Sequence, residues 1–456
     1  MATESQSSSG MEESASETGQ LLLEEIQGAF DSACSSLLFA CGGSIPISTE
    51  AAPGSPSPQN THSVAGSDLS STLPSSPITL RWDPENSSTP ASQCNLTFPL
   101  MDGQQEILAG LLRDMQPATF GFQGKDVYDE SYRKASKLDP SRFASTFNPY
   151  ELGIVDVVAQ LLLPNLQDDS DSRRGVRAEL SKLNVYSGPS GHFRAHVDTP
   201  RSVDQFGSLV VCLPVAYTGG QLVVQHLDRH VEFDWGTSQQ DMLNSPTIQW
   251  AAFYSDCTRE VLEVVSGHRI TLTYNLYATH GGGAITGLSN NTDMKSLFLY
   301  EQFSRLLQDD TVLSEGQCIG IYTTHAYPYT SGASGLPHAL KGIDGMQILK
   351  SLGCSTELLP IVKFPEAYCY NSSELSEKRF IGRYWGFDQI TGEIEDSSDE
   401  VQEMLNNWSK LDDDEVIWLN GPSSRHQEPQ ISYAAYGNQA EGECIYSTCA
   451  IFGWFR

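Results

Sequence analysis

A series of short β-rich runs between residues 181 and 278 constrains the fold of this chain more than any other feature. The runs cover residues 183–186, 209–215, 221–226, 230–235, 248–254, 260–265 and 270–277. Turn signals lie between them, among them Gly219-Gly220 and Ser266-Gly267. Several short strands at regular spacing are typical of an all-β sandwich or a jelly roll. The sequence therefore predicts a mainly β domain in this part of the chain.

Outside this region, apolar residues recur at steps of three and four, which predicts flanking helices. These helices are expected over residues 20–40, 104–113, 150–163, 294–307 and 401–409. The first is expected to end near Gly42-Gly43, since glycine commonly caps a helix C-terminus. Further strands are expected over residues 78–82, 319–324, 415–419 and 450–455. The fold class is thus mainly β with flanking helices (α+β), with a C-terminal α/β extension.

The chain has 456 residues, which is more than one ordinary compact domain needs. Residues 1–19 are rich in Ser and Glu and are expected to be a disordered tail, and residues 20–44 form the amphipathic helix and its cap. Residues 45–77 are a Ser/Pro-rich linker, residues 78–280 the β domain, and residues 281–456 an extension of unknown role. The run Gly281-Gly282-Gly283 marks the last boundary.

The net charge of −30, from 27 basic and 57 acidic residues, disfavours nucleic acid and anionic membranes as partners. Ten cysteines without a CxxC pair indicate neither a structural zinc site nor a secreted disulfide framework. No basic segment followed by an apolar core stands at the N-terminus, and no apolar run is long enough to span a bilayer. We expect an intracellular protein, cytoplasmic or nuclear, of unknown oligomeric state.

The segment His196-Val197-Asp198 places an imidazole and a carboxylate two residues apart. On a strand, both side chains point to the same face, as two ligands of one metal must. Two His and one carboxylate bind iron(II) and leave positions open for substrate and oxygen. Taken alone, the pair is also what two solvent-exposed polar side chains on an ordinary strand would look like.

The run 268–276 reads as a strand with alternating faces. Arg269, Thr271 and Thr273 share one face, and the side chains between them are mostly apolar. An Arg with hydroxyl neighbours inside a barrel suits a dicarboxylate, because the guanidinium forks onto a carboxylate. The alternative is a surface strand with a salt-bridged Arg.

Five segments of the chain resemble the prolyl 4-hydroxylase-type iron(II)/2-oxoglutarate-dependent dioxygenases, and most closely a group of fungal proteins of that superfamily. The segments are residues 128–135, 191–200, 205–211, 250–257 and 266–269. The resemblance covers most of the chain from about residue 20 and is most specific over residues 180–278. It implies a double-stranded β-helix with flanking helices.

The resemblance also implies roles for particular residues. His196 and Asp198 would bind Fe(II), and Arg269 would bind the C5 carboxylate of 2-oxoglutarate. Tyr186 and Thr271 would be further contacts of this cosubstrate. The implied reaction is the hydroxylation of an unknown protein or small-molecule substrate.

One position departs from the family pattern. The family has a second His ten residues before the cosubstrate Arg, and Arg259 stands there. Arginine stays protonated and offers no lone pair to a metal. Other histidines that could substitute, His192, His226, His230 and His268, lack the family's spacing, and His226 and His230 are interpreted as solvated turn residues.

Three interpretations follow. Iron binds through His196, Asp198 and water or a substitute, and a dioxygenase activity persists. Alternatively, Arg259 forms a salt bridge with Asp198 and the fold serves as a binding or regulatory module, or Arg259 is one aberrant position in an active lineage. Two further features are interpreted as structural. Residues 322–328 are expected to form a packed aromatic corner, and residues 412–415 a solvated acidic face.

Overall fold

The computed structural model describes residues 21, 23–28, 38–48, 74–84, 94–100, 103–122, 125–164, 174–280, 293–308, 318–329, 340–341, 345–363, 379–382, 406, 409–422, 436–437 and 445–454. The expected tail, most of the expected linker, the triple-glycine boundary and nearly all of the helix expected over 401–409 lie outside these residues.

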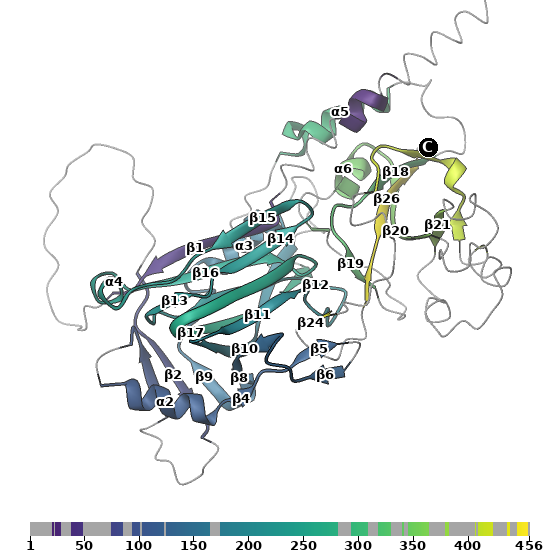
Figure 1. The fold of residues 1–456 in the computed structure, drawn as a ribbon. Coiled ribbons are helices and arrows are strands. Elements are labelled where there is room, and N and C mark those ends of the chain that lie inside the picture. The colour runs from purple at the N-terminus through teal and green to yellow at the C-terminus, as the bar shows by residue number, and fades with distance from the viewer. Residues whose placement is uncertain are drawn as a thin grey trace, which may run out of the picture.

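Two curved β layers that share one long strand form the larger part of the molecule (Figure 1). The strand order of the first layer is β1-β16-β12-β17-β10-β8-β4. Its strands are β1 (Ala40–Pro46), β16 (Thr247–Tyr254), β12 (Gln205–Cys212), β17 (Thr258–His280), β10 (Arg174–Ser187), β8 (Ser136–Leu138) and β4 (Gln116–Pro117). Every strand that the sequence predicts between residues 181 and 278 lies within a strand or overlaps one, and the mainly β fold class is confirmed.

The second layer forms on the N-terminal half of β17. Strands β11 and β14 pair with β17 on its two sides, β13 pairs with it near its middle, and β7 and β15 extend this layer outward. The strands are β7 (Arg133–Lys134), β11 (Gly191–His196), β13 (Tyr217–Gly219), β14 (Leu222–His226) and β15 (Arg229–Phe233). One strand therefore ties both layers together.

Strand β17 corrects one expectation from the sequence. Two strands with a turn at Ser266-Gly267 were predicted, but the strand runs unbroken for 23 residues. Gly267 has φ +77, and a Cβ there would lie 2.4 Å from the carbonyl oxygen of Ala216. The glycine thus allows a local bend and a close backbone approach within the strand instead of ending it.

The expected helix cap at Gly42-Gly43 is wrong, because both glycines lie in β1, which pairs with β16. A Cβ on Gly42 would lie 2.7 Å from the carbonyl oxygen of Trp250, and one on Gly43 would lie 3.2 Å from the indole nitrogen of that residue. These glycines serve the packing of an edge strand. Of the helix expected over 20–40, residues 21 and 23–28 are helical.

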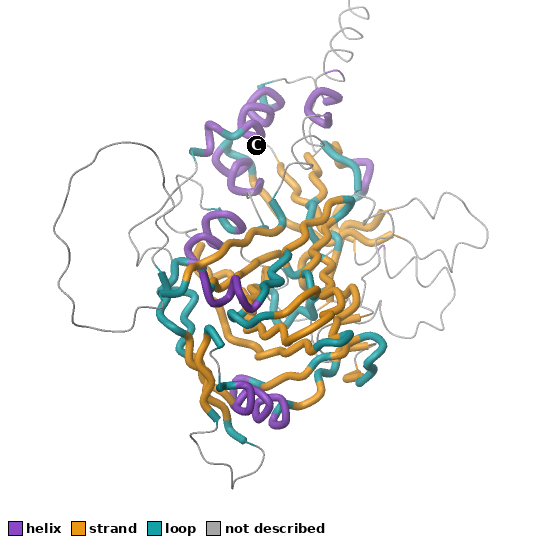
Figure 2. The backbone as a smooth tube through the Cα atoms, turned by 60° about the vertical axis from the view of Figure 1, so that its left-hand side comes forward, coloured by secondary structure: helices purple, strands orange, loops and turns teal. Residues whose placement is uncertain are grey.

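Short helices and small sheets cover the ends of the β layers, and Figure 2 shows the helices at the periphery of the strands. The helices predicted over 104–113 and 150–163 appear as α2 (Gln105–Asp114) and α3 (Ile154–Leu162). The remaining elements here are α4 (Gln239–Asn244), η2 (Pro140–Arg142), the sheet β3-β2-β9 (Asn95–Phe98, Ile78–Trp82, Phe143–Ser145) and the sheet β24-β5-β6 (Tyr436–Gly437, Phe120–Phe122, Lys125–Val127).

The C-terminal part has its own sheet and its own hydrophobic clusters. The strand order is β22-β21-β20-β26-β18-β23, with bounds Ser409–Leu411, Arg379–Gly382, Ser355–Lys363, Cys449–Trp454, Cys318–Tyr322 and Val416–Trp418. With it lie η5 (Met294–Ser296), α5 (Phe298–Leu306), α6 (Gly345–Ser351), η7 (Asp413–Glu415) and the pair β19 (Tyr327–Tyr329) and β25 (Ile445–Ser447). This arrangement agrees with the predicted α/β extension.

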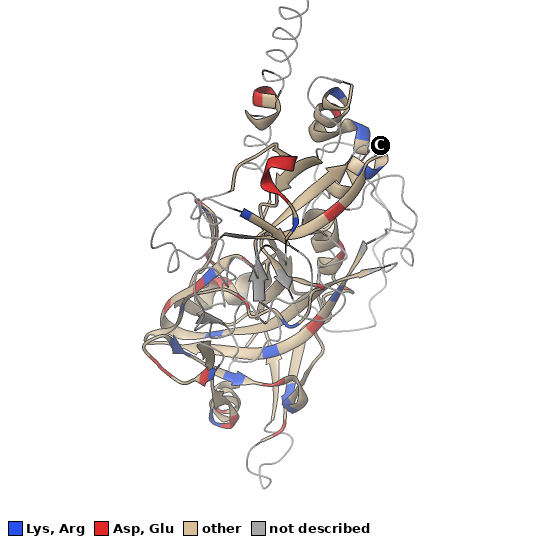
Figure 3. Cartoon of the chain, turned by 90° about the vertical axis from the view of Figure 1, so that its right-hand side faces the viewer, with Lys and Arg blue, Asp and Glu red and all other residues tan. Residues whose placement is uncertain are grey.

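The acidic run 412–415 lies largely in η7 at the surface of this part, as a solvated face would (Figure 3). Within the described ranges, no helix is both long and apolar enough to cross a bilayer.

The bend at Gly267 can be tested by substitution. Gly267→Ala forces a residue with a Cβ into a left-handed conformation against backbone atoms, and we expect it to lower the free energy of unfolding by about 1–3 kcal/mol in urea denaturation. Gly421→Ala is the matched control, because its Cβ would meet no heavy atom within 4 Å. Equal stability of the two variants would contradict a structural role for the bend.

Candidate functional site

A cavity opens between the two β layers and holds about 530 Å³ of empty space, its mouth included. Its walls come from strands β10, β11, β12, β14 and β17 and from Arg133 of β7. The lining residues are Arg133, Ser181, Lys182, Asn184, Tyr186, Phe193, His196, Val210, Leu222, Arg259, Val261, Arg269, Thr271 and Thr273. The predicted residues His196, Tyr186, Arg269 and Thr271 therefore meet at one place.

Strand alternation explains most of the lining. Arg269, Thr271 and Thr273 of β17 face the cavity together, as their spacing predicts. On β10, Lys182 also faces it, with Asn184 and Tyr186 at the same period of two. The pairing of β10 with β17 shifts register between Leu180 and Lys182, and this bulge brings the neighbouring Ser181 to the same wall.

His196, Asp198 and Arg259 form one contiguous buried group. His196 and Arg259 stand opposite each other in the pairing of β11 with β17. The Nε of Arg259 donates to Nε2 of His196 at 3.1 Å, and its Nη2 forms an ion pair with Oδ1 of Asp198. The side chains of Arg259 and Asp198 are 9% and 1% exposed, so this ion pair is shielded from water.

Neighbouring groups fix the orientation of this histidine and carboxylate. The Oγ of Ser208 donates to Oδ2 of Asp198 at 2.6 Å. The Nδ1 of His196 lies 2.8 Å from the carbonyl oxygen of Arg194, so it carries the proton and leaves Nε2 as the acceptor for Arg259. Phe193 stacks on the imidazole with ring centroids 3.5 Å apart. Burial and the positive charge of Arg259 lower the pKa of His196 well below its usual value.

This group does not fit an iron ion. The guanidinium of Arg259 occupies both the imidazole nitrogen and the carboxylate oxygen that would bind the metal. Other histidines considered as substitutes are engaged elsewhere: His192 contacts the carbonyl oxygens of Ser190 and Ser131, and His268 contacts Ser187. Iron binding by His196 and Asp198 therefore stays a prediction that this arrangement does not support.

Arg269 lines the same cavity and is 1% exposed. Its Nε and Nη2 have no hydrogen-bond partner among the described residues. The rings of Tyr186 and Trp235 lie 5.5 and 5.4 Å from its guanidinium carbon. A buried guanidinium with unsatisfied N–H groups is costly, and a carboxylate ligand would satisfy it.

Two further cations, which the sequence analysis did not single out, line the same cavity. Arg133 donates to the carbonyl oxygen of Thr119 at 2.6 Å and to Oδ1 of Asn184 at 3.0 Å. Burial, and next the charge of Arg133, lower the pKa of Lys182 to about 7. No Asp or Glu is among the lining residues, although the whole chain carries a charge of −30. Arg133 could have been found from the sequence, because it lies in the segment 128–135, which resembles the dioxygenase family.

A second group of buried polar residues lies around Asp256. The interpretation of His226 as a solvated turn residue is wrong, because it is buried beside this carboxylate. His325, expected in a packed aromatic corner, does pack against the ring of Tyr254, and it too lies beside Asp256. This group lies where the β layers meet the C-terminal part.

No protein-family model and no curated protein matches the chain. Among solved structures, it is similar in part to a prolyl hydroxylase of Trichoplax adhaerens, in complex with a peptide fragment of the hypoxia inducible factor oxygen degradation domain (15% identity, 35% of this chain and 70% of that chain, TM-score 0.23). It is also similar to a prolyl-4-hydroxylase of Pseudomonas putida (18% identity, 37% of this chain and 79% of that chain, TM-score 0.24). A third similar structure is an oxidoreductase of the 2OG-Fe(II) oxygenase family from Burkholderia pseudomallei (15% identity, 37% of this chain and 79% of that chain, TM-score 0.20).

These structural neighbours are prolyl hydroxylases and 2OG-Fe(II) oxygenases. The matches extend over little more than a third of this chain, and at their identities and scores they assign it neither a family nor an activity. The fungal grouping gains no support from them.

The ion pair between Arg259 and Asp198 predicts a strong effect of removing one partner. Arg259→Met leaves a buried carboxylate without its cation, and we expect a loss of about 3–5 kcal/mol in unfolding free energy. Adding Asp198→Asn keeps an acceptor for Ser208 and removes the charge, so the double variant should regain much of the loss. Urea denaturation measures both, and an unchanged single variant would contradict the role of the pair.

Proposed function

We propose that this chain binds a small dicarboxylate of the 2-oxoglutarate class in the cavity between its β layers, and that it does so as a binding or regulatory module without iron. The observation that carries the proposal is Arg269, a fully buried guanidinium whose Nε and Nη2 lack partners among the described residues. A carboxylate accepts two parallel hydrogen bonds from such a group.

The remaining lining favours a second negative charge on the ligand. Arg133 and Lys182 line the same cavity, and Asn184, Tyr186 and Thr271 add neutral hydrogen-bonding groups. The charge of Arg259 is already balanced by Asp198, so the excess positive charge lies with the other three cations. A dicarboxylate balances more of this charge than a monocarboxylate does. The resemblance of several segments to 2-oxoglutarate-dependent dioxygenases supports the same ligand class.

Arg259 supports the absence of iron. A metal at His196 and Asp198 would have to displace a buried ion pair and share its space with a permanent cation. The interpretation as a dioxygenase that hydroxylates a protein or small molecule would require Arg259 to leave this position. The geometry therefore favours binding over catalysis.

Isothermal titration with 2-oxoglutarate in chelator-treated buffer tests the binding. We expect one ligand per chain, and roughly 10–100-fold weaker binding by Arg269→Leu, since charged hydrogen bonds contribute about 1.5–3 kcal/mol. Arg81→Gln is the matched control, because Arg81 is exposed on β2, outside the cavity lining. If the native chain gives no heat of binding, or if both variants bind equally well, the proposal is wrong.

Anaerobic addition of Fe(II) with 2-oxoglutarate tests the second part of the proposal, that the chain binds no iron. The native chain should show no metal-to-ligand charge-transfer absorption, whereas Arg259→His supplies a third ligand and should gain it. If the native chain already shows this absorption and consumes 2-oxoglutarate in air, the dioxygenase interpretation replaces ours.

The pKa of Lys182 predicts how affinity depends on pH. An anion favours protonated Lys182, whose pKa is about 7 without ligand, so the affinity should fall as pH rises from 6.5 to 8.5. The fall is limited to about tenfold per pH unit, and the ligand's own carboxylates stay ionised over this range. Titrations at several pH values measure it, and Lys182→Met should remove the dependence. The same slope in Lys182→Met would assign the effect to another group.

A further inference from the structure

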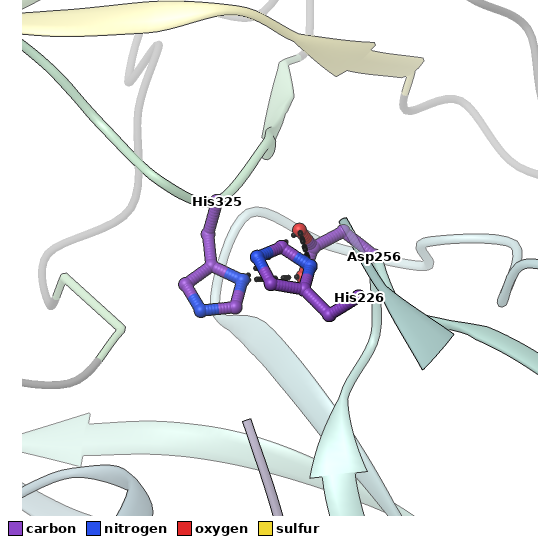
Figure 4. A group of neighbouring side chains, drawn as sticks. All are labelled: His226, Asp256 and His325. Atoms are coloured by element: carbon purple, nitrogen blue, oxygen red, sulfur yellow. Dashed lines mark hydrogen bonds and ion pairs between the residues drawn. The ribbon is translucent and has the colours of Figure 1, made fainter. Parts of the chain in front are cut away.

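Two imidazoles and one carboxylate from three distant segments meet at the seam between the β layers and the C-terminal part (Figure 4). His226 ends β14, Asp256 lies in the turn between β16 and β17, and His325 follows β18. Their ligand atoms all lie within 4.8 Å of one another. This group is separate from the cavity, whose lining contains none of the three residues.

The oxygen Oδ2 of Asp256 faces both imidazoles. It lies 3.1 Å from Nδ1 of His325 and 3.9 Å from Nδ1 of His226. Ligand atoms at about 2.0–2.2 Å from a tetrahedral zinc ion are roughly 3.3–3.6 Å apart, a range that lies between these two separations. The two rings are stacked, with centroids 4.2 Å apart and 19° between their planes, so binding one ion through both Nδ1 atoms requires a rotation of at least one ring. Figure 4 shows both imidazoles beside the carboxylate of Asp256.

The surroundings exclude water from this group. His226, Asp256 and His325 are 6%, 2% and 4% exposed. The ring of Tyr254 packs edge-on against His325, and Phe39 lies 5.8 Å from His226. Buried, dry and close-set nitrogen and oxygen ligands are what a transition-metal site requires.

Hydrogen bonds from Lys341 and from the backbone of Ala326 fix the orientation of the Asp256 carboxylate. The Nζ of Lys341 donates to Oδ1 of Asp256 at 2.7 Å and to the carbonyl oxygen of Ala326 at 3.0 Å. The backbone N–H of Ala326 donates to Oδ2 at 3.1 Å. The ion pair between Lys341 and Asp256 compensates the charge of this buried carboxylate. Such outer hydrogen bonds orient metal ligands in known sites.

We propose that His226, Asp256 and His325 bind a divalent transition-metal ion of the zinc class through two Nδ1 atoms and Oδ2, with Lys341 retained on Oδ1. In the metal-free state, Nδ1 of His325 carries the proton that it shares with Asp256. On binding, that proton moves to Nε2 and the Nδ1 lone pair becomes available to the metal. The site joins the β layers to the C-terminal sheet, so the metal stabilises the docking of these two parts.

Charge gives the proposal a distinctive signature. Asp256 and Lys341 neutralise each other, so a divalent ion adds two positive charges to a buried, balanced group. Removing the Lys341 ammonium also removes an orienting hydrogen bond, but its repulsion of a divalent ion is the larger effect in a buried group, so metal binding should strengthen. Removing an imidazole should weaken metal binding. If the three residues only stabilise the fold, no metal should bind, whether Lys341 or a histidine is replaced.

The test is titration of the full chain, after treatment with a chelator, with Co²⁺ and then Zn²⁺. Co²⁺ should bind one per chain with the intense visible absorption of a tetrahedral site, and Zn²⁺ should displace it and raise the melting temperature. His325→Ala and His226→Gln should each bind at least about 100-fold more weakly, since outer-group losses alone cost 10–100-fold. Lys341→Met should bind more tightly, and His230→Ala, an exposed histidine on β15, is the control.

The outcomes separate this site from the cavity. Absorption that survives in His196→Ala and disappears in His325→Ala supports the proposal, whatever the result with 2-oxoglutarate. Absorption that disappears in His196→Ala but survives in His325→Ala overturns it and points to the predicted iron ligands instead. Absence of binding in both the native chain and Lys341→Met also overturns it, even if the histidine variants fold poorly.

Discussion

Strand β17 pairs with β11 and β14 along its N-terminal half and with β10 and β12 along its C-terminal half. These pairings fix the backbone register, so Arg259 stands opposite His196 and Arg269 stands opposite Tyr186. Both guanidinium groups are therefore directed toward the cavity by the main chain, before any side-chain contact forms. The bend at Gly267 separates the two pairings and lets one strand serve both walls.

The group around Asp198 shows how a protein can balance a buried carboxylate without a metal. A divalent ion would accept electron pairs from His196 and Asp198, whereas Arg259 donates hydrogen bonds to the same atoms. Both solutions neutralise the carboxylate, but only the metal leaves positions open for reactants. With Arg259 in place, the buried side-chain atoms of the cavity lining that lack a hydrogen-bond partner among the described residues are Nε and Nη2 of Arg269 and Nε of Arg133. These guanidinium groups are the basis of the proposed recognition of an anion.

Local sequence patterns predicted what depends on period and spacing. The alternation in β17 placed Arg269 and Thr271 on the cavity wall. The position of Arg259 beside Asp198 was implied by the family resemblance, in which this site holds a metal ligand. Patterns failed where distant contacts decide the outcome. Gly42 fits a helix cap locally, but its contact with Trp250 makes it part of a strand. The burial of His226 depends on a segment about a hundred residues later, which no local pattern contains.

The turn that carries Asp256 connects two otherwise separate regions. Its neighbour Ser255 accepts a hydrogen bond from the backbone N–H of Asp198, while Asp256 itself is neutralised by Lys341 from the C-terminal part. A chain shortened to the β layers would keep this carboxylate and lose its cation. The carboxylate would then have to take up a proton or open the turn to water, next to the backbone that holds Asp198. The C-terminal part thus supplies the counterion that lets the β layers keep this carboxylate buried, and separating the two parts would leave Asp256 and Lys341 each without its partner.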